Sequence, residues 1–376
     1  MRVAGCEGSG VGAGGEGYGV GEAKGNERIV TKTWSTLHAH LHQTLRSRRL
    51  GDDNRPLPAE GETNFLLPPG AKLLVAASGG QDSQCLLRLL LDLRRQWHWQ
   101  LHVVHCNHRW RTDAEANAEF VAQLTAAWAV PCRIAVAAAP PTSEATARAW
   151  RYQVFAEVAA AWGCSHVVTG HTASDRAETL LFNLVRGSSL DGLQALTWQR
   201  SLSPTTPHIT LVRPLLTITR DQTGSFCRDF DIPIWEDITN ADRTYRRNRL
   251  RLDILPLLRE HFNPQVDATL AQTAEILTAE VAYLTAETDR LYGDCVMDER
   301  LQRRSLRTVP LALQRRVIRQ WLTHHLSTAP HFDHVDKVRA LVTAPNHSQT
   351  DPFPGGAIAV VNDPWILLQP QAHNRG

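Results

Sequence analysis

The feature that most constrains this chain is an apolar run, 72–77, followed at once by Ser78-Gly79-Gly80-Gln81-Asp82-Ser83 and then by a leucine-rich helical pattern. Two glycines let backbone N–H groups approach an anion closely, and the N-terminus of the next helix adds positive partial charge. Asp82 is placed to hold a divalent cation that bridges phosphates. The pattern predicts a strand, a phosphate-binding loop and a helix. The alternative is a tight turn in which Asp82 or Ser83 only caps the helix.

Apolar runs continue to alternate with amphipathic helical patterns to about residue 230. The further strands are expected at 101–105, 133–138, 166–169 and 209–216, and the helices at 85–97, 113–128, 146–162, 175–186 and 220–230. Continuous apolar strands between such helices predict an α/β fold with a parallel sheet covered by helices on both faces. Ligands of such sheets bind beyond the carboxyl ends of the strands, where the polar motifs of this chain fall.

Changes in composition divide the chain into four segments. Residues 1–30 are rich in Gly and Glu and are expected to be disordered. Residues 31–70 are expected to hold one helix, at 34–45, and a polar linker, and 71–240 the sheet domain. Residues 241–376 are predicted to be mainly helical, with a hairpin around Asn362-Asp363-Pro364 at the end; the expected helices lie at 246–262, 266–291, 311–325 and 335–343.

Bulk composition excludes several classes of protein. No apolar run is long enough to span a membrane, and the N-terminus lacks the basic start and apolar block of a secretory signal, so a cytoplasmic protein without membrane contact is expected. The seven cysteines are odd in number and none forms a C-x-x-C pair. They are therefore expected to be reduced and mostly buried, which argues against a zinc site and against sulfur-relay chemistry.

The loop residues also carry a resemblance. Ser-Gly-Gly-x-Asp-Ser resembles the signature of the PP-loop ATP pyrophosphatases, which attach AMP to a carbonyl oxygen and release pyrophosphate. The rest of the chain resembles the tRNA(Ile)-lysidine synthetase family, through the segments HCNHRWR (105–111), EATARAWRY (144–152), TGHTASDRAETLLFNLVRGSSLDGL (169–193), RPLL (213–216) and WEDITNADRTYRRNRLRLDILPLL (235–258).

This resemblance implies an adenine nucleotide hydrolase-like fold and an ATP-dependent, Mg²⁺-dependent ligase. The implied reaction joins L-lysine to C2 of the wobble cytidine of the isoleucine tRNA with a CAU anticodon, through an adenylated cytidine. It also implies that residues 78–83 and His105 bind ATP. Oligomeric state is left open, with a homodimer as one alternative.

Two carboxylates follow the strand expected at 166–169. Asp175 and Glu178 lie three apart on a helix and so share a face. They suit a metal ion or an ammonium group, and the resemblance implies that Asp82 and Asp175 bind metal while Asp175 and Glu178 position metal or lysine. The alternative is a capping box from Thr172 to Asp175. Thr172 and Ser174 replace residues usual in the family, so no role is assigned to these two side chains.

Arginines supply the other candidate groups. Arg148 and Arg151 are expected to stabilise negative charge in the transition state, with a solvated helix face as the alternative. The basic stretches Tyr245–Arg251 and Arg300–Arg319 are candidate contacts to the tRNA backbone. The histidines of HCNH lack a fourth zinc ligand, which disfavours a metal site, and the resemblance implies that this strand end frames adenine.

The sequence leaves three classes of function open. The first is lysidine formation, and the second is another PP-loop reaction, either tRNA thiolation or amidation. The third is a catalytically inactive protein that binds tRNA. Missing C-x-x-C pairs disfavour thiolation, and the absence of a glutaminase domain disfavours amidation.

Overall fold

The computed structural model describes residues 34–47, 65–236 and 242–370. The extension predicted to be disordered at 1–30 and most of the predicted linker lie outside these residues, as does the predicted domain boundary at 240–241. The predicted N-terminal helix is present as α1, Thr36–Ser47. Within the described ranges, no helix is both long enough and apolar enough to cross a membrane.

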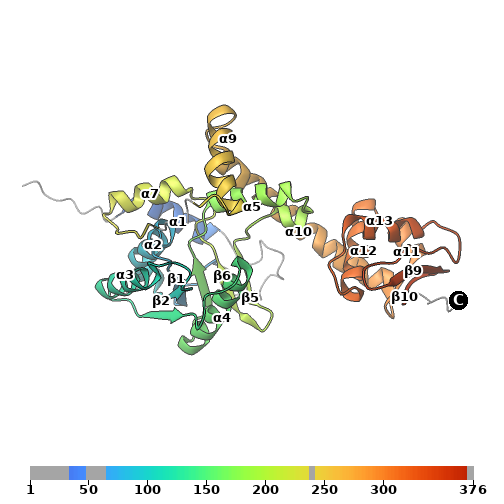
Figure 1. Ribbon diagram of the computed structural model, residues 1–376, viewed down its shortest axis with the longest axis horizontal. Coiled ribbons are helices and arrows are strands. Elements are labelled where there is room, and N and C mark those ends of the chain that lie inside the picture. The colour runs from blue at the N-terminus through green and yellow to red at the C-terminus, as the bar shows by residue number, and fades with distance from the viewer. Residues whose placement is uncertain (1–33, 48–64, 237–241, 371–376) are drawn as a thin grey trace, which may run out of the picture. The chain divides into compact units, whose positions relative to one another are not determined.

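A six-stranded sheet forms the centre of the first part of the chain (Figure 1). Its strand order is β3-β2-β1-β4-β6-β5, and all neighbours are parallel except β5 and β6. The bounds are β1 Lys72–Ala76, β2 Gln100–Asn107, β3 Cys132–Val136, β4 His166–Thr169, β5 Gln199–Ser203 and β6 Thr206–Val212. The predicted parallel sheet is confirmed. The strand expected at 209–216 begins and ends earlier, and β5 was not predicted.

Helices cover both faces of this sheet, as the continuous apolar strands predict. Alternate residues of β1 enter different cores: Leu73 and Val75 pack with α1, α2 and α7, whereas Leu74 packs with Val154 and Phe155 of α4. Each fully buried leucine contributes roughly 1.5–3 kcal/mol to folding. The helix bounds are α2 Gln81–Trp97, α3 Ala114–Ala127, α4 Glu144–Trp162, α5 Ala173–Val185, α6 Leu190–Leu193 and α7 Arg220–Asp229.

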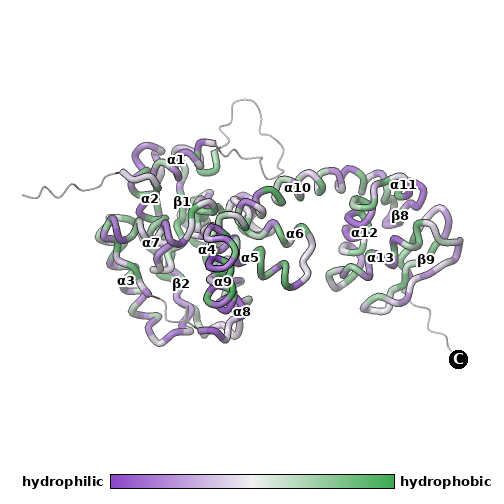
Figure 2. Tube along the Cα trace, turned by 90° about the horizontal axis from the view of Figure 1, so that it is seen from above, coloured by the Kyte–Doolittle hydropathy of each residue, from purple (hydrophilic) through white to green (hydrophobic). Residues whose placement is uncertain are grey.

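The second part of the chain is mainly helical, as predicted. The helix expected at 246–262 is present as one continuous helix over 246–261, and its middle turn is π-helical. Figure 2 shows hydrophilic and hydrophobic positions alternating along the long helix α10. The bounds are α8 Arg246–Arg249, η2 Leu250–Ile254, α9 Leu255–His261, α10 Val266–Cys295, α11 Arg303–Thr308, α12 Leu311–His325 and α13 Phe332–Leu341.

A small antiparallel sheet of order β7-β8-β10-β9 accompanies these helices. Strands β9 (Ala357–Asn362) and β10 (Trp365–Pro370) form the predicted hairpin, with a cis peptide between Asp363 and Pro364. The predicted set lacked β7 (Val296–Met297) and β8 (Arg300–Gln302), which are too short to show an alternating pattern. A separate apolar core joins this sheet to α12 and α13 around the fully buried Trp321.

Candidate active site

The phosphate loop, residues 78–83, folds as the sequence predicts. Gly79 has a φ of 89°, in the left-handed region, and the extended Gly80 precedes α2. The Ser83 hydroxyl holds the turn closed: it donates to the Gly80 carbonyl at 2.8 Å and accepts from the Ser78 N–H at 3.2 Å. Ser83 therefore closes the turn and does not cap α2, which follows the N-cap residue Gly80 without a side-chain cap.

Residues distant in sequence clamp the same loop from outside. The Trp235 N–H donates to the Gly79 carbonyl at 2.9 Å, and the Asn117 amide donates to the Ser78 carbonyl at 3.1 Å. A Cβ on Gly79 would lie only 2.4 Å from Asn117 Oδ1 and 3.3 Å from Trp235 Cβ. Glycine is thus required here for two reasons: the left-handed backbone angle and the close approach of Asn117.

Asp82 faces α7 from the first turn of α2. Arg220 Nη1 lies 3.3 Å from Asp82 Oδ2, and the Thr223 hydroxyl donates to Oδ1. Burial raises the pKa of Asp82, and the nearby Asp175 carboxylate raises it further, while Arg220 opposes both. A Cβ on Gly170 would lie 2.9 Å from the Asp82 carbonyl oxygen, so the segment that leads from β4 to Asp175 runs against Asp82.

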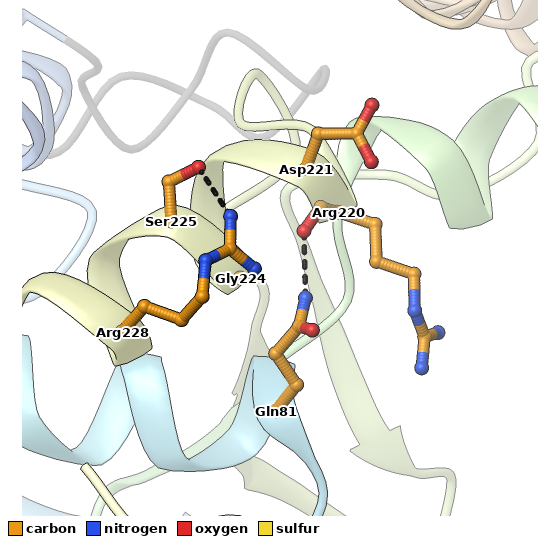
Figure 3. Close-up of a pocket in the computed structure, with 6 residues that line it drawn as sticks. All are labelled: Gln81, Arg220, Asp221, Gly224, Ser225 and Arg228. Atoms are coloured by element: carbon orange, nitrogen blue, oxygen red, sulfur yellow. Dashed lines mark hydrogen bonds between the residues drawn. The ribbon is translucent and has the colours of Figure 1, made fainter. Parts of the chain in front are cut away.

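Gln81 links the loop to α7. Its amide donates to the Arg220 carbonyl at 2.6 Å and to Thr223 Oγ1 at 2.8 Å. Figure 3 shows Gln81 extending toward the first turn of α7, beside a shallow hollow of about 290 Å³ lined by Gln81, Arg220, Asp221, Gly224, Ser225 and Arg228. Gln81 is the one residue of the loop 78–83 that lines this hollow, so the hollow is not the phosphate cradle.

Asp175 forms the capping box that was the alternative reading of this residue, and one of its two carboxylate oxygens is left outside the cap. Asp175 Oδ2 accepts from the Thr172 N–H at 2.8 Å, and the Thr172 hydroxyl accepts from the Asp175 N–H at 3.3 Å, so the capping box is present. The other oxygen, Oδ1, stays outside the cap and faces Arg247 and Arg251, each at 3.5 Å. Burial alone would raise the pKa of Asp175, but His171 and Arg247 favour the charged form and hold the pKa below its usual range.

Glu178 is almost fully buried beneath the same two arginines. Arg247 Nε lies 3.0 Å from Glu178 Oε2, and Arg251 Nε lies 2.5 Å from Oε1. We call Asp175, Glu178, Arg247 and Arg251 the carboxylate–arginine cluster. Arg247 and Arg251 belong to a stretch that the sequence suggested for tRNA contact, yet they point into the protein; of that stretch, Arg246 and Arg249 are more open to solvent.

Helix α5, which carries both carboxylates, is fixed by α10. The buried Arg176 donates to Glu275 Oε2 at 2.6 Å and to the Thr278 hydroxyl at 3.0 Å. The Trp198 indole N–H also donates to Glu275 Oε2, at 2.8 Å. Charge-assisted hydrogen bonds of this kind set the position of α5 and therefore of the carboxylates on its first turns.

The histidines near the carboxyl edge are neutral. His105 is buried, its Nδ1 lies 2.8 Å from the Ala77 carbonyl oxygen, and burial lowers its pKa. Burial also lowers the pKa of His108 to about 4. Among the described residues, no group of three His, Cys, Asp or Glu side chains is arranged to hold a metal.

Arg148 and Arg151 lie on the exposed side of α4 but do not act together. Arg148 donates to the Tyr152 hydroxyl at 3.2 Å. In the described part of the chain, the Arg151 side chain makes no hydrogen bond or ion pair. Its charge acts on His108 and Cys106. Arg148 instead acts on His171. The two charges therefore act at different strand ends. The charge of Arg148 acts at the ends of β4 and β6, and that of Arg151 acts at the end of β2.

The second basic stretch, 300–319, is partly neutralised by its own domain. Arg303 is buried and lies 2.9 Å from Asp363, and Arg315 lies 3.2 Å from Asp336. Arg307 donates to the Val342 carbonyl at 2.9 Å. These arginines stabilise the fold, whereas Arg304 stays largely exposed, so RNA contact by this stretch remains a prediction.

The donor set fits a magnesium ion. Mg²⁺ is usually held by one or two carboxylates and completes its shell with water and substrate phosphate oxygens. Asp82 and Asp175 Oδ1 supply such carboxylates beside a loop suited to phosphates. Glu178 has its two oxygens held by arginines at 3.0 and 2.5 Å, closer than the 3.5 Å contacts of Asp175 Oδ1, so it is a poorer direct ligand.

Sequence reasoning missed the residues that hold the site in place: Asn117, Arg220, Thr223 and Trp235. No local pattern marks them, because each acts on a residue far away in the chain. Trp235 and Arg247 did lie within a segment that carries the family resemblance, and that was the available signal.

Comparison with known proteins gives concordant matches. A model of the PP-loop domain matches residues 60–258, and a model of the TilS substrate binding domain matches residues 301–361. The tRNA(Ile)-lysidine synthase of Nostoc sp. is 51% identical over 352 residues, covering 89% of this chain and 97% of the relative. That of Thermosynechococcus vestitus is 49% identical over 337 residues, covering 89% and 92%.

More distant matches extend the comparison. The chloroplastic tRNA(Ile)-lysidine synthase of Zygnema circumcarinatum is 34% identical over 329 residues, covering 76% of this chain and 78% of the relative. Among solved structures, the U34-tRNA thiolase NcsA from Methanococcus maripaludis aligns with a TM-score of 0.49 at 15% identity, covering 64% of this chain and 78% of that chain. That structural likeness is too distant to bear on function.

Proposed function

This chain belongs to the tRNA(Ile)-lysidine synthase family, and we propose that it joins L-lysine to C2 of the wobble cytidine in a CAU-anticodon isoleucine tRNA, using ATP. The observation that carries the proposal is the placement of two features at one edge of the parallel sheet. A phosphate loop follows β1, and the carboxylates of the partly buried Asp175 and the buried Glu178 follow β4, its neighbour. A triphosphate and a cationic amine can therefore be held side by side.

The proposed reaction has two steps. In the first, the C2 carbonyl oxygen of cytidine attacks the α-phosphate of ATP, a P–O bond forms, and pyrophosphate leaves. In the second, the lysine amine attacks C2, a C–N bond forms, AMP leaves with the former carbonyl oxygen, and the amine loses a proton. The wobble base is unpaired in an anticodon loop, so reaching it needs no opening of a duplex.

Loop residues 78–83 would hold the phosphates through backbone N–H groups and the α2 N-terminus, with the neutral His105 beside them framing adenine. Asp82 and Asp175 would hold Mg²⁺, which neutralises phosphate charge when bound. Arg151, at the rim, would stabilise negative charge on the transferring group, whereas Arg148, predicted for the same role, is held beside Tyr152 instead.

Asp175 and Glu178 would position the lysine substrate, by the same charge that now attracts Arg247 and Arg251. Asp175 stays ionised, because His171 and Arg247 hold its pKa below the usual range, and an ammonium group requires such a charge. Lysine binding then exchanges one cationic partner for another, rather than burying a new uncompensated charge.

The alternative of sulfur relay gains nothing from the structure. Cys85 and Cys227 contact each other between α2 and α7, a pairing that the sequence did not suggest. Both are buried, and burial raises the pKa of the Cys85 thiol well above its usual range. The hydrogen bond with Cys85 lowers the pKa of Cys227, but both side chains are shut off from solvent, where a sulfur donor would have to reach them, so this pair does not support thiolation.

The test is mass spectrometry of a CAU-anticodon tRNA transcript incubated with protein, ATP and isotopically labelled lysine. We expect one lysine per transcript, with AMP and pyrophosphate as products, and loss of this activity in Asp82→Asn. Sulfur incorporation would favour the thiolase alternative. Tight RNA binding without pyrophosphate release would favour the inactive tRNA-binding alternative, and full activity in Asp82→Asn would contradict the proposed site.

A further inference from the structure

Three arginines gather around one tyrosine at the carboxyl edge of the sheet, and only Arg148 was anticipated. Arg148 comes from the start of α4, Arg200 from β5, and Arg213 directly follows β6. Arg200 lies opposite Leu211 in the β5–β6 pairing, so it sits close to the end of β6. We call Arg148, Tyr152, Arg200 and Arg213 the tyrosine–arginine cluster.

The cluster is held in place by contacts that leave its charge uncompensated. The guanidinium carbons of Arg148 and Arg200 lie 5.3 and 4.9 Å from the centre of the Tyr152 ring. Arg200 donates to the Ser201 carbonyl at 2.9 Å, and Arg213 donates to the Thr197 carbonyl at 2.6 Å. These partners are neutral, so they orient the guanidinium groups without cancelling their charge.

No carboxylate pairs with Arg148, Arg200 or Arg213 anywhere in residues 34–47, 65–236 and 242–370. Arg213 is only 2% exposed, and its Nε has no hydrogen-bond partner among these residues. Burial lowers the pKa of Arg213 to about 10, and the charges of Arg200 and Arg148 contribute to the lowering. Burial alone would raise the pKa of Tyr152, but the three arginines outweigh it and lower that pKa.

Buried charges are ordinarily paired, because an isolated ion loses its hydration without compensation. The carboxylate–arginine cluster nearby obeys this rule with two arginines on two carboxylates. The tyrosine–arginine cluster has three arginines and no carboxylate. An anionic ligand at this edge would supply the missing charge, and guanidinium groups match the oxygens of a phosphate.

The phosphates of ATP already have a cradle elsewhere. β6 is separated from β1 by β4, so Arg213 lies about 10 Å from the phosphate loop at ordinary strand spacing. A second phosphate group, carried by the other large substrate, fits this distance better than the triphosphate gripped by residues 78–83.

We propose that Arg148, Arg200 and Arg213 around Tyr152 form a binding site for one backbone phosphate of the substrate RNA, close to the nucleoside that is modified. The site rests on the proposed function, since it takes an RNA as the ligand. Arg200 and Arg213 act as binding and positioning residues, which fix the anticodon loop against the edge of the sheet.

The test measures binding of a CAU anticodon stem-loop RNA to Arg200→Gln and, separately, binding of ATP with Mg²⁺. We expect RNA affinity to fall about tenfold, as for the loss of a charged hydrogen bond. We expect the slope of log Kd against log salt to drop by about 0.7–0.9, the contribution of one phosphate contact. ATP affinity is expected to stay unchanged. Arg200→Lys, which keeps the charge, is expected to recover most of the affinity.

Arg95→Gln is the matched control, because Arg95 is exposed on the last turn of α2, far along the chain from the cluster. It removes the same charge and should leave both the RNA affinity and the salt slope nearly unchanged. Equal losses in Arg95→Gln and Arg200→Gln would show only a general charge effect and would overturn the site.

A second measurement identifies the phosphate. Stem-loops are made with one neutral methylphosphonate linkage, moved along the anticodon loop. In the wild-type protein, one linkage should weaken binding about tenfold, and Arg200→Gln should be insensitive to that linkage alone. Loss of ATP affinity instead of RNA affinity would assign the arginines to the nucleotide and overturn the proposal. Unchanged RNA binding with a lower unfolding free energy would make the cluster purely structural.

Failure of the proposed function gives a different result. In that case the wild-type protein shows no preference for the CAU stem-loop over a stem-loop with another anticodon. If Arg200→Gln instead binds the CAU stem-loop with wild-type affinity and wild-type preference, the phosphate site is refuted and the proposed function stands.

Discussion

The phosphate loop and the carboxylate–arginine cluster lie at the same edge of the sheet, but they are built in different ways. The loop is six consecutive residues whose shape follows from a left-handed glycine and a serine hydroxyl that closes the turn. The cluster joins residues up to 76 positions apart and is held by opposite charges. The comparison suggests that the loop depends on local backbone geometry, whereas the cluster depends on the fold that brings its charges together.

The largest expected effect comes from breaking the backbone geometry of the loop. Gly79→Ala places a Cβ 2.4 Å from Asn117 Oδ1 at a φ of 89°. The strain amounts to about 3 kcal/mol, so ATP affinity should fall roughly 100-fold as the loop shifts. Calorimetric titration with ATP and Mg²⁺ measures the change.

The control for this variant is Gly187→Ala. Gly187 also has a positive φ, of 73°, but a Cβ there meets nothing within 4 Å. It should lower stability modestly and leave ATP binding intact. An unchanged ATP Kd in Gly79→Ala would show that the loop tolerates reshaping, and the contrast between the two regions would then be lost.

A smaller effect is expected from breaking the charge balance of the cluster. Glu178→Gln leaves Arg247 and Arg251 with only Asp175 as a carboxylate partner. Removing one member of a buried ion pair costs about 3–5 kcal/mol, and partial exposure of the arginines reduces this to roughly 2–3 kcal/mol. Urea unfolding should show the loss, and the double variant Glu178→Gln, Arg251→Gln should recover part of it.

Glu287→Gln provides the comparison for the Glu178 variant, because Glu287 pairs with Arg290 at the surface of α10. Exposed pairs add little to stability, so little change is expected. If Glu178→Gln were as stable as Glu287→Gln, the cluster would not depend on its charges.

A histidine outside both regions gives the third prediction. His166, in β4, has its pKa lowered to about 4 by burial, whereas the unfolded chain titrates near 6.5. Below pH 6.5 the unfolded state therefore binds more protons, and the folded state loses stability as the pH falls toward 4. Between pH 7 and pH 5, His166 accounts for a loss of about 2 kcal/mol.

Between pH 7 and pH 5, the free energy of unfolding of His166→Asn should fall by about 2 kcal/mol less than that of the wild-type protein. Urea unfolding at each pH measures the difference. Identical pH profiles for wild type and His166→Asn would contradict the assignment and would move the pH dependence to other groups.

Much of this architecture could be predicted because it rests on local patterns. The apolar run before Ser78 and the glycines after it define a strand, a turn and a helix within about 25 residues. Helix α12 occupies the predicted residues 311–325. The strand β5 escaped prediction because its residues, QRSLS, are mostly polar and show no apolar run.

The site was predictable only in part. Asp82 and Asp175 stand beside recognisable helix starts, so their positions followed from the sequence. The inward direction of Arg247 and Arg251, and the uncompensated charge around Tyr152, depend on tertiary packing. An arginine looks the same in sequence whether its side chain faces solvent, pairs with a carboxylate or lies in the interior without one.

The π-helical turn at Leu250–Ile254 has a consequence for how this segment can change in length. Such a turn holds one more residue than an α-helical turn, so removing a single residue there would restore a regular helix. Every residue beyond the deletion would then rotate by about 100° about the helix axis relative to Arg247. Arg251 lies inside the turn, so its reach toward Glu178 depends on residue count as well as on residue type. Insertions and deletions should therefore be tolerated less well here than conservative substitutions.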